Sequence, residues 1–223
     1  MTVEQLAACI DHTLLKPEAT PEQVAKLCRE ALDFGFASVC VNARFVPLAA
    51  AALQGSKIKA CTVVGFPLGA TTTDVKVSEA KQAIAAGATE IDMVLWVGGV
   101  KAKQDNDVRR DIAEVATACH TSGAILKVIL ETSLLTDEEI AHACRLCIEA
   151  KADFVKTSTG FSSGGATAEA VQIMADAVKS AGLGVKASGG IRNYDDAMTM
   201  IEAGATRLGA SAGVKIIEEA RTK

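Results

Sequence analysis

Two lysines interrupt apolar segments of this sequence, which raises the question of what chemistry a buried amine can do. Lys156 lies in the stretch FVKTSTG, and Lys186 lies in the stretch VKASGG. A buried ammonium costs on the order of several kcal/mol unless its pKa falls or opposite charges compensate it. We therefore expect these lysines to serve a function beyond packing.

The two lysine segments are expected to be neighbouring strands, which lie about 4.8 Å apart in a sheet. Two ammonium groups at that spacing repel each other, so we expect the pKa of one to fall below its reference value of about 10.4. The neutral amine that results can attack a carbonyl carbon. The pair thus predicts a Schiff-base enzyme acting on a small carbonyl compound.

Charged residues in other apolar segments offer a second interpretation of the lysines, as members of ion pairs or as chains that extend to solvent. Asp92, in EIDMV, and Glu131, in KVILE, are the candidate partners. Asp92 is also a candidate proton donor and acceptor for Schiff-base chemistry, and the two roles are compatible. Asp11 and Lys127 could relay protons or balance the lysine charges.

The seven cysteines and three histidines do not predict a metal site or a disulfide framework. Cys40 lies in SVCVN with no histidine beside it, which favours core packing over a nucleophilic role. Cys144 and Cys147 fall on one apolar helical stripe, which favours helix core over a redox pair. We expect no metal and no other cofactor.

Glycines follow the last two apolar segments, at Gly189 and Gly190 and again at Gly209, with Ser211 close behind. In barrel enzymes the loops at these two places often bind phosphate through backbone N–H groups and a helix N-terminus. The glycines therefore predict a phosphate site near the lysines.

The elements that must position these residues form an alternating pattern of short apolar segments and longer helical ones, typical of parallel strands joined by crossover helices. Eight strands are expected, at residues 10–14, 37–41, 59–64, 90–95, 125–131, 154–157, 184–187 and 207–210. This pattern predicts a TIM (β/α)8 barrel, formed as a single domain over residues 1–223. An open doubly wound sheet is the alternative.

Helix boundaries are marked by residue type. Residues 20–23 and 136–139 each combine an N-cap threonine with a capping-box Gln or Glu. The stripes expected to be buried are residues 24, 27, 28, 31 and 32 in the first helix and 140, 143, 144, 147 and 148 in the second. Gly87 and Gly204 are expected to end helices in the left-handed conformation.

Composition excludes several classes of protein. A chain of 223 residues with 49% hydrophobic and 22% charged residues is globular rather than disordered. The net charge of -4 and the scattered Lys and Arg give no basic surface for nucleic acid. Without a signal sequence or an apolar run of roughly 20 residues, we expect a cytoplasmic protein with no membrane partner, either a monomer or a homodimer.

At these residues the sequence resembles the deoxyribose-phosphate aldolases, from Ile10 to about Gly213. The most specific stretches are FVKTSTGF and VKASGGIR, supported by VCVN, EIDMV and KVILET. The resemblance implies a metal-independent class I aldolase of deoxyribose phosphate catabolism. Such an enzyme reversibly cleaves 2-deoxy-D-ribose 5-phosphate into D-glyceraldehyde 3-phosphate and acetaldehyde.

The resemblance also implies a role for individual residues. Lys156 would form the Schiff base, Lys186 would perturb it and transfer protons, Asp92 would donate and accept protons, and Asp11 would support the relay. Cys40 matches a cysteine that aldehydes can trap and that turnover does not need. The positions that match substrate and phosphate contacts are Thr159, Gly160, Gly189, Gly190, Gly209 and Ser211.

Two positions depart from the family pattern. Trp96 stands where relatives more often carry Asn, which leaves the pocket wall or its selectivity at that position open. Some relatives end in a tyrosine that assists proton transfer, whereas this sequence ends in EEARTK and its only tyrosine is Tyr194. We expect that contribution to be absent or replaced.

Two other functions fit the same residues. A barrel that only binds phosphorylated metabolites could use the lysines as charge partners, and a Schiff-base aldolase could take a donor other than acetaldehyde. Trapping of an imine on Lys156 separates the first from an aldolase, and a comparison of aldehyde and ketone donors separates the second.

Overall fold

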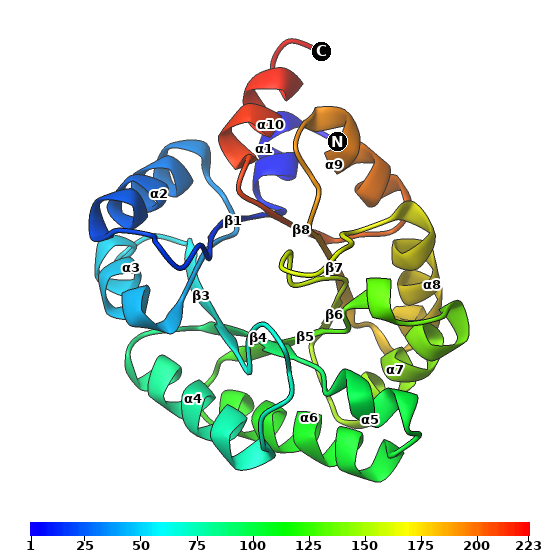
Figure 1. Ribbon diagram of the computed structural model, residues 1–223. Helices are drawn as coiled ribbons and strands as arrows, with labels where there is room; N and C mark the ends of the chain where they lie inside the picture. The colour runs from blue at the N-terminus through cyan, green and yellow to red at the C-terminus, as the bar shows by residue number, and fades with distance from the viewer.

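Eight parallel strands close in chain order into a barrel in the computed structural model, which describes residues 1–223 (Figure 1). The strand bounds are β1 Ile10–Leu14, β2 Ser38–Val41, β3 Lys59–Val64, β4 Glu90–Val94, β5 Ile125–Ile129, β6 Phe154–Lys156, β7 Gly184–Ser188 and β8 Arg207–Ala210. Because β8 pairs with β1, the sheet has no open edge. The predicted barrel is confirmed, and the open doubly wound sheet is wrong.

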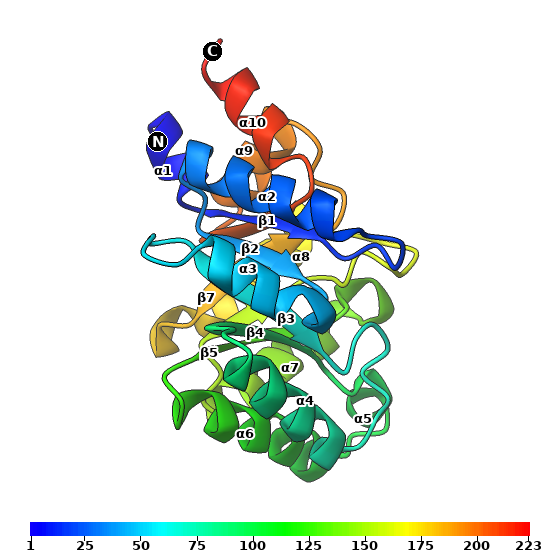
Figure 2. The same ribbon diagram turned by 90° about the vertical axis from the view of Figure 1, so that its left-hand side faces the viewer.

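Helices surround the barrel and cover the outer face of the sheet (Figures 1 and 2). They are α1 Val3–Ala7, α2 Pro21–Phe34, α3 Val46–Ala52, α4 Thr73–Ala85, α5 Val97–Lys101, α6 Asp105–His120, α7 Asp137–Glu149, α8 Ala168–Val178, α9 Tyr194–Glu202 and α10 Gly213–Ala220. Short 3-10 turns are η1 Ala43–Phe45, η2 Thr132–Leu134 and η3 Lys179–Ala181. None of these helices combines the length and the apolar character that a bilayer crossing requires.

The expected helix starts are confirmed, because Thr20 and Thr136 each form a complete capping box. The two stripes pack inward as expected, except that Leu32 is 42% exposed. Leu32 lies about 80° around the helix from Val24, at the edge of the stripe. Cys144 and Cys147 are buried in α7, which confirms the helix-core interpretation.

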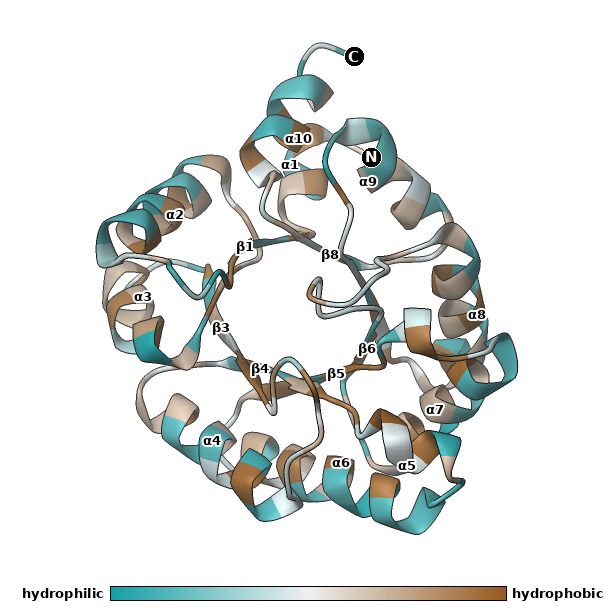
Figure 3. Cartoon of the chain, in the orientation of Figure 1, coloured by the Kyte–Doolittle hydropathy of each residue, from teal (hydrophilic) through white to brown (hydrophobic).

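The two faces of the barrel wall differ in chemistry. Apolar side chains on the outer face pack against the helices in one cluster of 54 buried residues, and Figure 3 shows the strands largely apolar and much of the helical surface hydrophilic. The inner face instead gathers charged side chains that contact one another, namely Asp11, Glu90, Asp92, Lys127, Lys156, Lys186 and Arg207. The barrel therefore holds an ionic centre inside an apolar shell.

Gly87 provides a test of this packing. Its φ is 108°, and a Cβ atom added there would lie 2.6 Å from Cβ of Ala50 in α3. Gly55, with φ of 79°, has no atom within 4 Å of that position. We expect Gly87→Ala to lower the free energy of unfolding by about 2–4 kcal/mol and Gly55→Ala by about 1 kcal/mol, measured by urea denaturation. Equal losses would show that the contact with α3 does not matter.

Candidate active site

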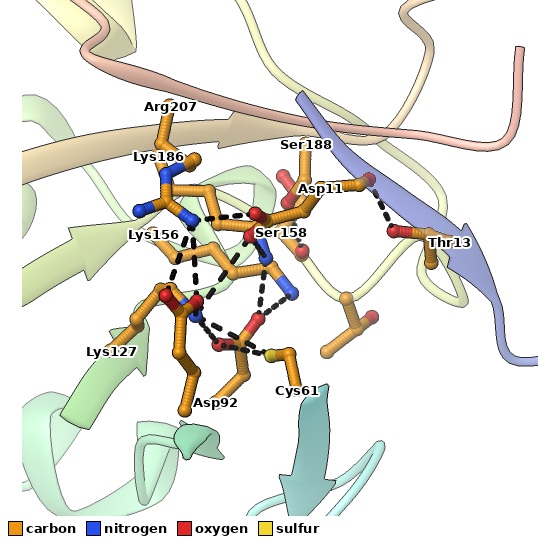
Figure 4. Close-up of polar contacts among 12 residues, drawn as sticks. Asp11, Thr13, Cys61, Asp92, Lys127, Lys156, Ser158, Lys186, Ser188 and Arg207 are labelled. Atoms are coloured by element: carbon orange, nitrogen blue, oxygen red, sulfur yellow. Dashed lines mark hydrogen bonds and ion pairs between the residues drawn. The ribbon is translucent and has the colours of Figure 1, made fainter. Parts of the chain in front are cut away.

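The centre of the site is the carboxylate of Asp92, which three lysines share (Figure 4). Its Oδ1 accepts a hydrogen bond from Lys127 Nζ at 2.8 Å. Its Oδ2 accepts from Lys156 Nζ at 2.9 Å and from Lys186 Nζ at 2.7 Å. Because the last two amines contact the same oxygen atom, the expected proximity of Lys156 and Lys186 is confirmed.

The lysines reach this carboxylate from neighbouring strands. The register pairs Asp92 with Lys127 across β4 and β5, and Lys156 with Lys186 across β6 and β7. All four side chains are buried, so the interpretation in which the lysines extend to solvent is wrong. Their pairing with Asp92 is confirmed.

A second layer of charges surrounds the first. Asp11 contacts Lys186 at 2.5 Å and Arg207 at 2.7 Å, and Glu90 contacts Lys127 at 2.6 Å. Sequence reasoning did not assign Glu90 or Arg207. The available signal was strand alternation, because Glu90 lies two residues before Asp92 and so shares its face.

The pKa values of these groups follow from competition between burial and neighbouring charge. Burial raises the pKa of Asp92, but Lys127, Lys156 and Lys186 hold it well below its usual range. Burial lowers the pKa of Lys186, but Asp11 and Asp92 raise it above its ordinary value. Repulsion between the two lysines therefore does not lower the pKa of Lys186, because carboxylates contact it directly. Lys186 stays charged beside Lys156.

Lys156 differs from the other two lysines in its contacts and its access. Lys156 pairs with one carboxylate, whereas Lys186 pairs with two and Lys127 with three. Of the three, only Lys156 lines the cavity of about 450 Å³ at the carboxyl ends of the strands. It is therefore the amine that a bound molecule can reach.

The predicted binding residues line this same cavity with Lys156. They are Thr159, Gly160, Gly189, Gly190, Gly209 and Ser211. Gly189 and Gly190 have φ values of 86° and 84°, a conformation that glycine adopts without strain. Lys16 and Arg192 also line the cavity. Exposed backbone and two cationic side chains suit an anionic ligand group.

Hydrogen bonds between the ends of β6 and β7 keep the lysine strands in place. Thr157 Oγ1 donates to the Ser188 carbonyl at 3.0 Å and accepts from the Ser188 amide at 3.0 Å. Ser188 Oγ donates to the Ser158 carbonyl at 2.6 Å. The segments that follow the two lysines are therefore joined at the floor of the cavity.

Glu131 does not pair with a lysine, so its expected role as a charge partner is wrong. The residue follows β5 in the left-handed conformation, with φ of 57°. This turn directs its carboxylate to Thr159, whose hydroxyl donates to Glu131 Oε2 at 2.5 Å.

Cys40 is fully buried in a small cluster with Leu15, Cys61 and Val63, as core packing predicts. A hydrogen bond with Cys61 lowers the pKa of the Cys40 thiol. Ligand atoms of Cys40, Cys61 and Asp92 lie within 4.8 Å of one another and could hold a metal ion. The Asp92 carboxylate, however, is already bonded to lysines. The histidines pair separately with carboxylates, as His12–Glu30, His120–Asp153 and His142–Asp105.

The two departures from the family pattern lie away from the cavity that contains Lys156. Trp96 precedes α5 and lines a separate cavity of about 710 Å³ between α4 and α6, not the cavity that contains Lys156. The cause is that the chain turns away from the barrel after β4 ends at Val94. Tyr194 begins α9, and its ring lies 4.7 Å from Lys223 Nζ.

Fold and site together define an aldolase of the lysine-dependent barrel class. Residues 6–219 match the sequence profile of the DeoC/LacD family aldolases. The chain belongs to this family.

Alignments with named relatives cover nearly the whole chain. The deoxyribose-phosphate aldolase of Caldanaerobacter subterraneus subsp. tengcongensis is 57% identical, over 96% of this chain and 93% of that protein. The one from Clostridium tetani is 56% identical, over 95% of this chain and 97% of that protein. The structure of a tetrameric deoxyribose phosphate aldolase from Aeropyrum pernix superposes with a TM-score of 0.93 at 38% identity, covering 99% of this chain and 93% of that chain.

The lowered pKa of Asp92 predicts how stability depends on pH. A carboxylate whose pKa is lowered by folding stabilises the protein above the unfolded-state pKa of about 3.9, and this stabilisation is lost as the pH falls further. We expect Asp92→Asn to lower the free energy of unfolding by about 3–5 kcal/mol at pH 7, because buried lysines lose their partner. The loss should shrink below pH 4.

Urea denaturation between pH 3 and pH 7 measures this dependence. Asp176→Asn on the exposed surface of α8 is the matched control and should change little at any pH. A pH-independent loss in Asp92→Asn would contradict the electrostatic explanation.

Proposed function

We propose that this protein is a deoxyribose-phosphate aldolase that reversibly cleaves 2-deoxy-D-ribose 5-phosphate into D-glyceraldehyde 3-phosphate and acetaldehyde. The observation that carries the proposal is the contact of Lys156 with the Asp92 oxygen that also bonds Lys186, at the floor of a glycine-lined cavity. The names of the relatives support the same reaction. The reaction class needs no metal ion.

The first step is attack of the Lys156 amine on the carbonyl carbon of the open-chain sugar. The amine must give up a proton before it attacks, and it lies in a cluster of four cations and three carboxylates. Of the lysines, Lys156 breaks the fewest ion pairs when it does so. Attack forms a carbinolamine, and loss of water gives the imine.

Proton transfer in this scheme is assigned to the groups around Lys156. Asp92 contacts Lys156 and Lys186 through one oxygen, so it can pass a proton between the carbinolamine and Lys186. Asp11 supports the relay by pairing with the far side of Lys186 at 2.5 Å. Transfer of the C3 hydroxyl proton to the Asp92 relay, with the electrons of the C2–C3 bond moving to the imine nitrogen, breaks that bond and releases glyceraldehyde 3-phosphate.

The two-carbon fragment then remains on Lys156 as an enamine. Protonation of its terminal carbon gives an imine, and addition of water releases acetaldehyde and restores the amine. The electrons of the broken bond are held by the protonated imine nitrogen during cleavage. The positive charge of Lys186 nearby favours the uncharged enamine over the imine cation.

The phosphate group is assigned to the glycine side of the cavity. Gly189 and Gly190 after β7, Gly209 in β8 and Ser211 after it present backbone groups there, and Thr159 and Gly160 form the facing wall. Cys40, buried behind Leu15, is assigned no part in turnover beyond sensitivity to aldehydes.

The proposal also covers the domain organisation, the cellular location and the partners of the protein. We infer one barrel domain over residues 1–223, which the closed sheet and the shared core support. We also infer a cytoplasmic enzyme of deoxyribose phosphate catabolism, with a phosphorylated sugar and acetaldehyde as its partners and without nucleic acid or membrane. A homodimer stays a prediction, and a tetramer is described for the Aeropyrum pernix relative.

Borohydride trapping tests the proposal. With acetaldehyde, reduction should leave an ethyl group on Lys156, detected by mass spectrometry of peptides. Lys156→Leu should remove both the adduct and at least about 10⁴-fold of the activity, since the covalent step is lost. Lys81→Leu, on the outer face of α4, is the control and should keep both.

Phosphate recognition gives a separate prediction. Ser211→Asp places a negative charge in the cavity, so we expect KM for deoxyribose 5-phosphate to rise at least about tenfold through repulsion. Activity on unphosphorylated deoxyribose should change little, as measured by steady-state kinetics. Ser122→Asp, on an exposed turn after α6, is the control. Equal losses with both sugars would contradict this phosphate position.

Borohydride trapping also tests the two alternative functions. The first is a barrel that only binds phosphorylated metabolites, and the second is a Schiff-base aldolase whose donor is not acetaldehyde. Binding without a trappable imine would favour the first. An adduct with dihydroxyacetone phosphate or pyruvate, but not with acetaldehyde, would favour the second.

A further inference from the structure

Glu131 is a buried charged residue that the catalytic scheme does not use. The residue is only 3% exposed, and together with Thr159 it lines a small cavity of about 150 Å³. No Lys, Arg or His lies within ion-pair distance of it, in contrast to the carboxylates of the barrel centre. The left-handed backbone at φ of 57° is unusual and unfavourable for a residue with a side chain.

The side-chain hydrogen bonds of Glu131 all come from Thr159, three residues after Lys156. Thr159 Oγ1 donates to Glu131 Oε2 at 2.5 Å, and the Thr159 amide lies 3.4 Å from both carboxylate oxygens. The next contact runs along the loop, because the Phe161 amide donates to Thr159 Oγ1 at 3.0 Å. The glutamate therefore holds the first turn of the loop between β6 and α8.

These contacts determine which hydrogen-bonding positions of the Thr159 hydroxyl stay free for a ligand. A hydroxyl has one proton and two acceptor positions. Glu131 takes the proton of Thr159, and the Phe161 amide takes one acceptor position. One acceptor position remains, and because Thr159 lines the cavity, a hydroxyl group of a bound ligand can fill it as a donor.

We propose that Glu131 is a positioning residue that sets Thr159 as a hydrogen-bond acceptor for a hydroxyl group of the sugar substrate. The inference rests on the proposed function, because Thr159 and Lys156 line the same cavity. The substrates favoured are those with a free hydroxyl beyond the carbon that bonds to Lys156. Glu131 itself does not touch the reacting atoms.

Three variants separate positioning from general stability. Glu131→Leu removes the acceptor, Glu131→Gln keeps one oxygen, and Thr159→Val removes the hydroxyl. Loss of a hydrogen bond to a buried charge predicts a rise in KM for deoxyribose 5-phosphate of about 10- to 100-fold in Glu131→Leu. Glu131→Gln should stay within about threefold, and Thr159→Val combined with Glu131→Leu should be no worse than either alone.

The donor half of the reaction is an internal control. Acetaldehyde needs no second hydroxyl, so borohydride should label Lys156 equally in Glu131→Leu and in the unaltered protein. Glu219→Leu is the matched control, because Glu219 accepts a hydrogen bond from the Tyr194 amide at 2.8 Å, away from the cavity. It should leave KM unchanged.

Amide hydrogen exchange tests the structural part without using activity. The amides of Thr159 and Phe161 should exchange at least about tenfold faster in Glu131→Leu than in Glu131→Gln. Unchanged exchange and unchanged KM in Glu131→Leu would overturn the inference, as would a loss that Glu131→Gln does not rescue. Failure of the proposed function would look different, since the unaltered protein would then show no adduct on Lys156, and exchange would still decide the role of Glu131.

Discussion

The structure depends on the sharing of one carboxylate, that of Asp92, among three buried ammonium groups. An ammonium inside the barrel is tolerated only when its desolvation is offset by close opposite charge. Asp92 provides that charge to Lys127, Lys156 and Lys186, while Asp11 and Glu90 hold the outer sides of the cluster. The same contacts that stabilise the barrel interior keep the amine of Lys156 beside the carboxylate of Asp92.

This arrangement divides the work among the lysines. Lys127 is surrounded by carboxylates and does not line the cavity, so its role is to anchor Asp92. Lys186 pairs with two carboxylates, which raise its pKa and favour its charged form. Lys156 has one such contact and faces the cavity. Identical side chains thus take different roles according to the number of carboxylates each one contacts.

Much of the fold and the main residues of the site could be predicted from the sequence, because strand patterns and buried charges are local signals. The predicted strands start and end within two residues of those observed, and Asp92 was identified as the lysine partner. The register between strands is not a local signal, so Arg207 was missed. The pKa of one of the two lysines was expected to fall through their mutual repulsion. The contact of Lys186 with Asp11, which raises the pKa of Lys186, is a contact between distant segments that local patterns do not reveal.

Two further positions have local causes that become visible only in three dimensions. Glu131 was expected to pair with a lysine, but it follows the last residue of β5 in a left-handed turn that takes its carboxylate to Thr159. Trp96 was singled out by the family pattern alone, and it lines a separate cavity after β4 has ended.

The ion pair of Arg207 with Asp11 joins the last strand of the barrel to the first, over 196 positions of sequence. The pair therefore spans the seam at which β8 meets β1 and the ring closes. Arg207 also reaches Glu90 of β4, so one guanidinium ties both sides of the seam to the far wall of the barrel. A substitution at this single position would loosen the closure of the sheet and the charge cluster around Asp92 together.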